Sequence, residues 1–176
     1  RFSDLTVDGS FAVGGALCAQ LLVGKMLAPW AALGVVFVVG ASLGVITGLL
    51  HIGLGLSALI SGIVTTTAVF SVNLKIAGPS IALLAVPTIF SSWASGMSVA
   101  MQTTIVLSVI ALAVVGAVAW LLTTEVGYML KTVGCNPQML ANLGKHGGKY
   151  TLLALALANG FTAIAGALFV QHAGFF

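Results

Sequence analysis

Long apolar runs separated by short polar segments dominate this chain. Five runs are apolar enough to cross or enter a lipid bilayer, and they cover residues 9–23, 31–50, 57–73, 104–123 and 151–171. A helix needs about 20 mostly apolar residues to span the hydrocarbon core, and the second, fourth and fifth runs reach that length. The pattern predicts an all-α protein, a polytopic membrane helix bundle with about five membrane segments.

The first run is short, and polar or small residues stand where it begins. Thr6, Asp8 and Gly9 lie at or just before its start. Irregular backbone at membrane depth is tolerated only where protein or a water-filled cavity surrounds it. We therefore expect an early helix that is broken inside the membrane.

Glycines recur at the spacing of one helical face. Gly40, Gly44 and Gly48 share one face of the second run, and Gly160 and Gly166 each follow a small residue by four positions. Small residues let helix backbones approach closely in lipid. These positions predict close helix packing.

Composition excludes a water-soluble domain. Hydrophobic residues make up 60% of the 176 residues and charged residues only 5%, against about one quarter charged in an average soluble domain. The net charge of +3 comes from scattered side chains, which form no stripe for nucleic acid. Cys18 and Cys135 belong to no metal-binding or redox spacing. The chain begins without Met and stops after an apolar run, so we expect a single transmembrane domain over 1–176, incomplete at both ends.

The cations predict an orientation. If the runs alternate in direction, one side of the membrane carries Arg1, Lys131, Lys145 and Lys149, whereas the other carries Lys25 and Lys75. Loops rich in Lys and Arg face the cytoplasm. The segment 124–150 is therefore predicted to be cytoplasmic, and 76–101 to be an external segment in or near the interface.

The segment 124–150 contains the pattern of a short helix. Asn136 is a suitable N-cap, Pro137 suits the first helical position, and Gly144 can end the helix after Leu143. The result is a helix of about two turns, with apolar contacts from Met139, Leu140 and Leu143. Such a helix suits a groove on a soluble partner or a position on lipid headgroups, and the residues alone favour neither.

Polar residues in and beside the apolar runs are candidates for a solute pathway, because such groups are costly in lipid and often functional. They are Asp4, Thr6, Asp8, Ser10, Ser61, Thr65, Thr66, Thr67 and Asn73. For each Ser and Thr, a hydrogen bond within the protein is the simpler interpretation. Asp8 is equally suited to capping its helix.

Four stretches of the chain resemble one family of membrane proteins. Residues 4–11 (DLTVDGSF) are similar to a DLSVG-type motif, and 48–67 to a turn followed by a Thr-rich helix. Residues 127–144, centred on VGCNP, resemble the stretch GRxIYAVGGNPxAARLSGI, and 157–168 resemble the small-residue helix that follows. In this order they resemble the permeases of ABC importers for branched-chain amino acids, ribose and related solutes. The endings DGSF and NP resemble a subgroup associated with aromatic amino acids or other small solutes.

Three positions depart from that family's pattern. Cys135 stands where a second Gly is usual, Tyr128 replaces a common Arg, and the pair Leu140-Ala141 stands where Ala-Arg is usual. These departures bear on how strongly a partner binds and leave the resemblance itself intact.

The resemblance implies a coupling segment that docks on a cytosolic ABC ATPase. The residues it assigns to this segment are Val133, Gly134, Cys135, Asn136, Pro137, Met139, Leu140, Leu143 and Gly144. It further implies a second permease copy or homologue, an extracytoplasmic solute-binding protein, membrane lipid around the spans and a place in the bacterial inner membrane.

No nucleotide site is visible in the chain. It has no G-x-x-x-x-G-K-[ST] phosphate loop, so ATP and Mg are expected on the partner ATPase and no cofactor in this chain. It also lacks HExxH and GxSxG hydrolase motifs, which argues against an enzyme. The alternatives are a secondary transporter or channel, and a structural membrane anchor.

Overall fold

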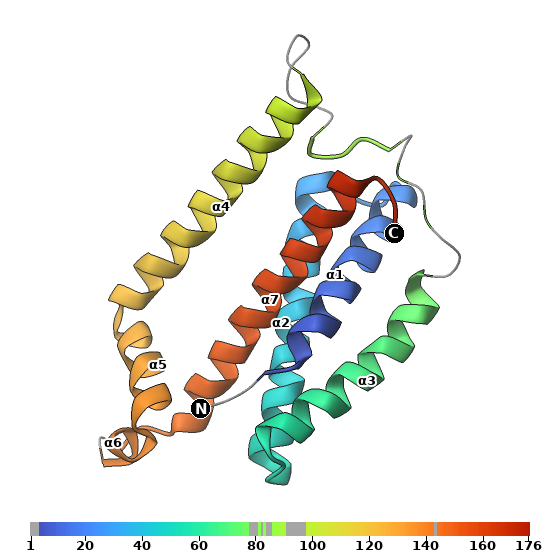
Figure 1. The fold of residues 1–176 in the computed structure, drawn as a ribbon. Coiled ribbons are helices and arrows are strands. Elements are labelled where there is room, and N and C mark those ends of the chain that lie inside the picture. Colours follow the sequence, from blue (N-terminus) through green and yellow to red (C-terminus); the bar gives the residue numbers. More distant parts are fainter. Residues whose placement is uncertain (1–3, 78–80, 82, 84–85, 91–97, 143) are drawn as a thin grey trace.

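The computed structural model describes residues 4–77, 81, 83, 86–90, 98–142 and 144–176, and this part of the chain contains seven helices (Figure 1). They are α1 (Thr6–Val23), α2 (Pro29–Leu54), α3 (Ala58–Ala77), α4 (Val99–Thr123), α5 (Glu125–Cys135), α6 (Pro137–Asn142) and α7 (Gly147–Ala173). Five of them, α1, α2, α3, α4 and α7, are long and apolar enough to cross a membrane. The protein is therefore an all-α, multi-pass membrane protein, as its apolar runs predict.

The start of α1 differs from the sequence prediction. The helix begins at Thr6, so Thr6 and Asp8 lie in its first turn instead of before it. Asp4 explains the earlier start, because its Oδ1 accepts the backbone N–H of Thr6 at 2.9 Å. That bond satisfies one of the unpaired N–H groups at a helix N-terminus.

Helices α1, α2, α3 and α7 form the bundle (Figure 1). Close backbone approach holds α7 against two of them. A Cβ at Gly40 of α2 would lie 2.6 Å from the Asn159 carbonyl oxygen, and one at Gly44 would overlap the Leu155 carbonyl. A Cβ at Gly166 would overlap the Phe11 carbonyl of α1 in the same way. The predicted glycines therefore lie where helix backbones meet.

Two further predicted packing positions meet side chains instead of backbone. A Cβ at Gly48 would lie 2.5 Å from Leu152 Cδ2, and one at Gly160 would lie 2.7 Å from Phe37 Cε2. Both pairs join α2 to α7. The helix pair is thus in contact over most of its length.

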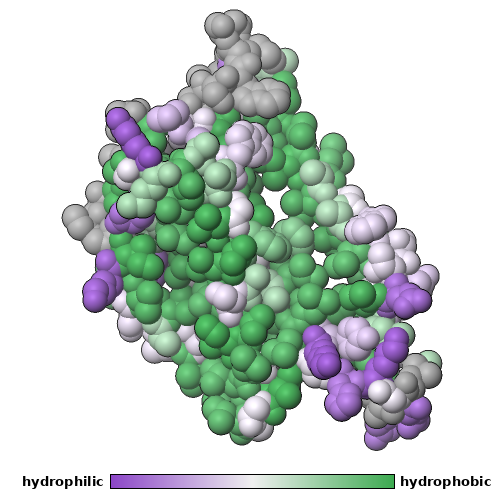
Figure 2. Space-filling view, turned by 180° about the vertical axis from the view of Figure 1, so that it is seen from behind, coloured by the Kyte–Doolittle hydropathy of each residue, from purple (hydrophilic) through white to green (hydrophobic). Residues whose placement is uncertain are grey.

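Helix α4 stands apart from this bundle (Figure 1). Only 6% of its most apolar 18-residue window is buried in the structure. Figure 2 shows hydrophobic residues on both sides of the gap between α4 and the other helices. At its C-terminal end α4 is joined to α5, where a Cβ on Gly127 would overlap the Leu121 carbonyl.

The two ends of the bundle differ. At one end, which we call the α5–α6 end, lie α5, α6, the start of α7 and the α2–α3 turn (Figure 1). At the opposite end, Ile81 and Phe176 exchange two backbone hydrogen bonds of 3.0 Å. There Gln171 of α7 also accepts the N–H of Ile89 at 3.1 Å. Part of the segment predicted to be external is thus held on the end of α7.

Two sequence predictions are corrected here. Residues predicted as a single loop, 124–150, contain a second helix, α5, and the first turn of α7. The predicted external segment 76–101 is shorter, because α3 continues to Ala77 and α4 begins at Val99. Pro79 and Trp93 of that segment lie outside the described residues.

Candidate functional site

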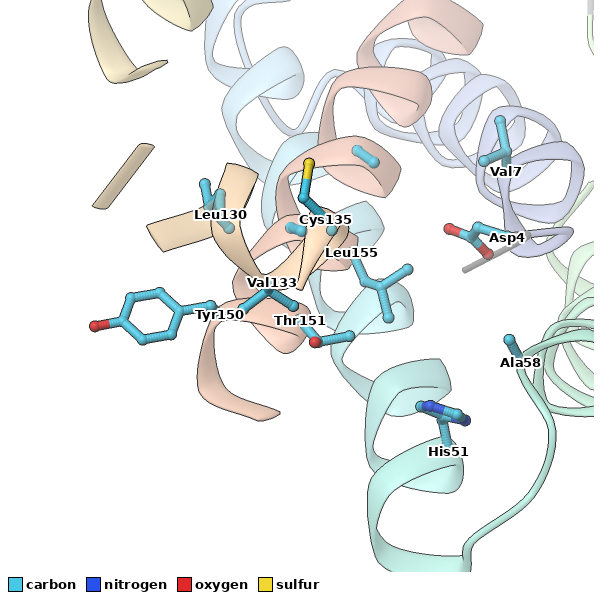
Figure 3. A pocket seen from close by; sticks show the side chains of 13 residues that line it. Asp4, Val7, His51, Ala58, Leu130, Val133, Cys135, Tyr150, Thr151 and Leu155 are labelled. Carbon is cyan, nitrogen blue, oxygen red and sulfur yellow. The ribbon is translucent and has the colours of Figure 1, made fainter. Parts of the chain in front are cut away.

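A cavity of about 540 Å³ opens between α1, α2, α5 and α7, with the start of α3 at its edge. Figure 3 shows Asp4 and Val7 on one side of it and Leu130, Val133 and Cys135 on the other. Its size lies within the range of about 300–1,000 Å³ that small-molecule sites occupy. The cavity is therefore large enough for a small solute.

A polar cluster joins α1 to α7 at this cavity. Asn159 is fully buried and donates from Nδ2 to Asp4 Oδ2 at 2.7 Å and to the Leu155 carbonyl at 3.0 Å. Its Oδ1 accepts the Ser10 hydroxyl at 2.6 Å. No ion pair to Asp4 occurs among the described residues. The carboxylate is therefore held by neutral donors.

A second polar contact joins α1 to α2. The Thr6 and Thr47 hydroxyl oxygens lie 2.9 Å apart, and both side chains are fully buried. Thr47 also donates to the Leu43 carbonyl of its own helix. With the Asp4–Asn159 pair, this contact fixes the first turn of α1 against two helices.

One face of the first turn of α1 packs against α2 and α7. Asn159, its partner, is near the middle of α7, which runs from Gly147 to Ala173. A helix end at that depth is tolerated where protein groups or a cavity satisfy its polar backbone, and Asp4 and the cavity provide both. The predicted break inside α1 is not found, because α1 is continuous from Thr6 to Val23.

Three of the predicted solute-pathway residues meet at this place, namely Asp4, Thr6 and Ser10. Asp8 is exposed and is not part of the cluster. Thr66 lies nearby, because its hydroxyl donates to the Leu5 carbonyl at 2.9 Å.

The remaining predicted pathway residues lie on α3. Ser61, Thr65 and Thr67 donate to carbonyls four residues earlier in that helix. Asn73 is buried, and its Oδ1 has no hydrogen-bond partner in the described structure. None of these four belongs to the polar cluster at Asp4.

Sequence reasoning missed Asn159, Thr47 and His51 as site residues. Asn159 lies within the stretch 157–168 that resembles the family's small-residue helix. A carboxamide within an apolar span is costly in lipid, and this could have identified Asn159 as a site residue. His51 lines the cavity, and its Nδ1 lies 2.7 Å from the Leu56 carbonyl oxygen.

The predicted coupling segment forms part of the cavity wall. Val133, Gly134 and Cys135, at the end of α5, line it. Asn136 caps α6 as predicted, because its Oδ1 accepts the N–H groups of Gln138 and Met139 at 3.1 and 3.3 Å.

Other residues of this segment differ in exposure. Leu140 is fully buried, whereas Met139 is 53% exposed. Pro137 opens α6, and Gly144 follows this helix in the left-handed region at φ +70°, where glycine is favoured. Leu143 lies outside the described residues.

We find no candidate metal site among the described residues. The described residues contain no group of three or more His, Cys, Asp or Glu side chains that could hold a metal ion. The polar groups that line the cavity are instead a carboxylate, two hydroxyls, a thiol and an imidazole, and these can form hydrogen bonds with a small polar solute.

Comparison with known proteins identifies relatives over nearly the whole chain. It is 33% identical over 175 residues to the tyrosine transport system permease protein of Clostridioides difficile (strain R20291), covering 99% of this chain and 57% of that protein. It is 30% identical over 181 residues to the uncharacterized protein RP368 of Rickettsia prowazekii (strain Madrid E), covering 99% of this chain and 60% of that protein. The chain thus spans less than two thirds of the length of either relative. No solved structure matches it.

A family model described as "Branched-chain amino acid transport system / permease component" matches residues 1–176. The five apolar helices, and the cavity lined by α1, α2, α5 and α7, are consistent with that description. The chain belongs to the family of permease components of branched-chain amino acid transport systems.

Proposed function

We propose that this chain is the membrane-spanning permease part of an ABC importer in a bacterial inner membrane. It moves a small, amino acid-like solute inward, driven by ATP hydrolysis on a separate ATPase subunit that binds ATP and Mg. The observation that carries the proposal is that one segment, Val133–Cys135, both lines the solute cavity and leads directly into α6.

This arrangement gives a mechanical route for coupling. A partner that binds α6 more tightly in one conformation than in the other shifts the equilibrium between them. Because α5 forms one wall of the cavity and α1 the other, displacement of α5 changes the space between Cys135 and Asp4. The ATPase would therefore act on the solute site through one short helix.

The docking surface follows from burial. Gln138, Met139 and Asn142 of α6 are exposed, so they can meet a partner, while buried Leu140 holds α6 in place. In this proposal the α5–α6 end faces the cytoplasm. Lys131, Lys145 and Lys149 lie at this end, and loops rich in Lys and Arg remain on the cytoplasmic side of the membrane. An extracytoplasmic solute-binding protein would deliver solute at the opposite end, and a second permease copy or homologue would complete the assembly.

The solute class rests on two observations. One relative is described as a tyrosine transport permease. In addition, Asp4 presents to the cavity a carboxylate that has only neutral partners among the described residues. A carboxylate in this setting favours an ammonium group, as amino acids carry.

A secondary transporter is the second candidate, because polar groups beside a cavity between membrane helices are also expected in that class. Dependence of uptake on ATP separates the two. In a secondary transporter, uptake would follow an ion gradient and no ATPase would be bound.

The test is affinity purification of the full-length protein from its native membrane in mild detergent, followed by identification of bound ATPase. Met139→Asp should release the ATPase, whereas Met26→Asp should retain it, because Met26 is 73% exposed but lies in the α1–α2 turn at the opposite end. If the parent retains no ATPase even after crosslinking, the importer proposal fails. If both variants retain it, α6 is not the docking element.

A further inference from the structure

A second apolar hollow lies on the membrane-facing side of the molecule. This groove, of about 360 Å³, runs between α4 and α7 beside α5. Helix α4 contributes Val118, Leu121 and Leu122, while α7 contributes Ala154, Leu157 and Phe161. These helices are apolar over the length needed to cross a bilayer, so the groove lies where lipid chains are present.

One cation lies in the wall of this groove. Lys131 of α5 lines it, with Nζ 3.3 Å from the Leu122 carbonyl oxygen and 5.5 Å from the centre of the Tyr128 ring. An ammonium group has three donors, so Lys131 can bind a further acceptor. The described residues include no ion pair to Lys131. Figure 2 shows hydrophilic residues gathered at the α5–α6 end below the hydrophobic surface.

We propose that the groove binds one anionic phospholipid of the leaflet at the α5–α6 end. An acyl chain lies between α4 and α7, and the phosphate accepts from Lys131. The pairing of an apolar groove with a single cation at the end nearest the polar loop matches such a lipid in both polarity and charge.

The lipid would also lie beside the solute cavity. Leu130, Ala154 and Ala158 line both the groove and the cavity. The two spaces therefore lie next to each other, so an acyl chain in the groove would lie beside the cavity wall that these residues form. This proposal concerns lipid alone and does not depend on the ATPase.

The test uses native mass spectrometry of the full-length protein, incubated in detergent micelles with equal amounts of phosphatidylglycerol and phosphatidylcholine. The parent should retain phosphatidylglycerol preferentially. Lys131→Ala should lower that preference about fivefold, the factor expected for one lysine next to anionic lipid, while Lys131→Arg should preserve it. Lys149→Ala is the matched control, because it removes the same charge at the same end but does not line the groove.

A second variant tests the groove itself. Ala154→Trp should fill it and reduce retention of both lipids. Equal retention of the two lipids by the parent would overturn the proposal. So would equal losses in Lys131→Ala and Lys149→Ala, since lipid would then bind to the general positive charge of this end.

Discussion

Asn159 of α7 donates to Asp4 at 2.7 Å and so joins the start of the first helix to the middle of the last. The same carboxamide accepts from Ser10 at 2.6 Å. One side chain therefore supports both the carboxylate at the cavity and the first turns of α1.

Removal of Asn159 should destabilise the protein strongly. In Asn159→Ala, Asp4 and Ser10 each lose a buried partner, and an unsatisfied buried polar group costs about 1–3 kcal/mol. We expect a total loss of about 3 kcal/mol in the free energy of unfolding, measured by denaturant titration of the purified protein.

Asn73→Ala is the matched control for that experiment. Asn73 is also buried, but its Oδ1 has no partner in the described structure. We therefore expect a change below about 1 kcal/mol, because no hydrogen bond of that atom is lost. Equal effects of the two substitutions would contradict a special role for Asn159.

The charge of Asp4 should matter for transport. Asp4→Asn keeps the size of the side chain and an acceptor for the Thr6 N–H, but it removes the negative charge from the cavity and the second acceptor, Oδ2, which receives the Asn159 Nδ2 donor. We expect solute uptake by the reconstituted transporter to fall at least about tenfold, the equivalent of 1.4 kcal/mol. Asp8→Asn should leave uptake unchanged, because Asp8 is exposed away from the cavity. Unchanged uptake in Asp4→Asn would remove Asp4 from the pathway.

Alanine substitutions at two glycines of α2 should have opposite effects on the stability of the protein. Gly44→Ala places a Cβ onto the Leu155 carbonyl, whereas a Cβ at Gly34 meets nothing within 4 Å. Gly44→Ala must separate α2 from α7, with an expected cost of about 1–3 kcal/mol. Gly34→Ala should be neutral or stabilising by up to about 1 kcal/mol, since alanine favours the helix. Thermal unfolding in detergent measures both, and equal melting temperatures would contradict the close approach.

Cys135 provides a test of orientation. It is exposed and lines the cavity at the α5–α6 end, while Cys18 is fully buried. If that end is cytoplasmic, a membrane-impermeant maleimide should label Cys135 in inverted vesicles and not in right-side-out vesicles. Labelling should be lost in Cys135→Ser, which shows that the signal comes from this thiol. Labelling only in right-side-out vesicles would reverse the orientation.

The sequence predicted the helical fold well, because each membrane helix is one long apolar run. The N-cap at Asn136 was also predictable, since its signal is local: a side-chain oxygen one position before a proline-initiated helix. Helix α5 was missed because it lies in a polar segment between two spans. Its start is set by Thr124, whose hydroxyl accepts the N–H of Gly127 at 3.4 Å.

The polar cluster could be predicted only in part. Asp4, Thr6 and Ser10 stood out as polar residues beside an apolar run, but their partners lie 41 to 155 positions away. Which of two nearby carboxylates enters the bundle depends on where α1 begins and which way each side chain faces. The sequence offered both Asp4 and Asp8 as pathway residues, whereas the structure places only Asp4 at the cavity and leaves Asp8 exposed.

The length of α1 has an electrical consequence. The cavity is lined by Asp4 at its inner side, and α1 runs from there for 18 residues to the opposite end of the bundle, about 27 Å at 1.5 Å per residue. That length is close to the whole hydrocarbon core, which is about 30 Å thick. Most of the transmembrane voltage therefore falls between Asp4 and the opposite end. A charged solute that arrives from that end crosses most of this voltage, worth about 2.3 kcal/mol per elementary charge at 100 mV, before it reaches the carboxylate.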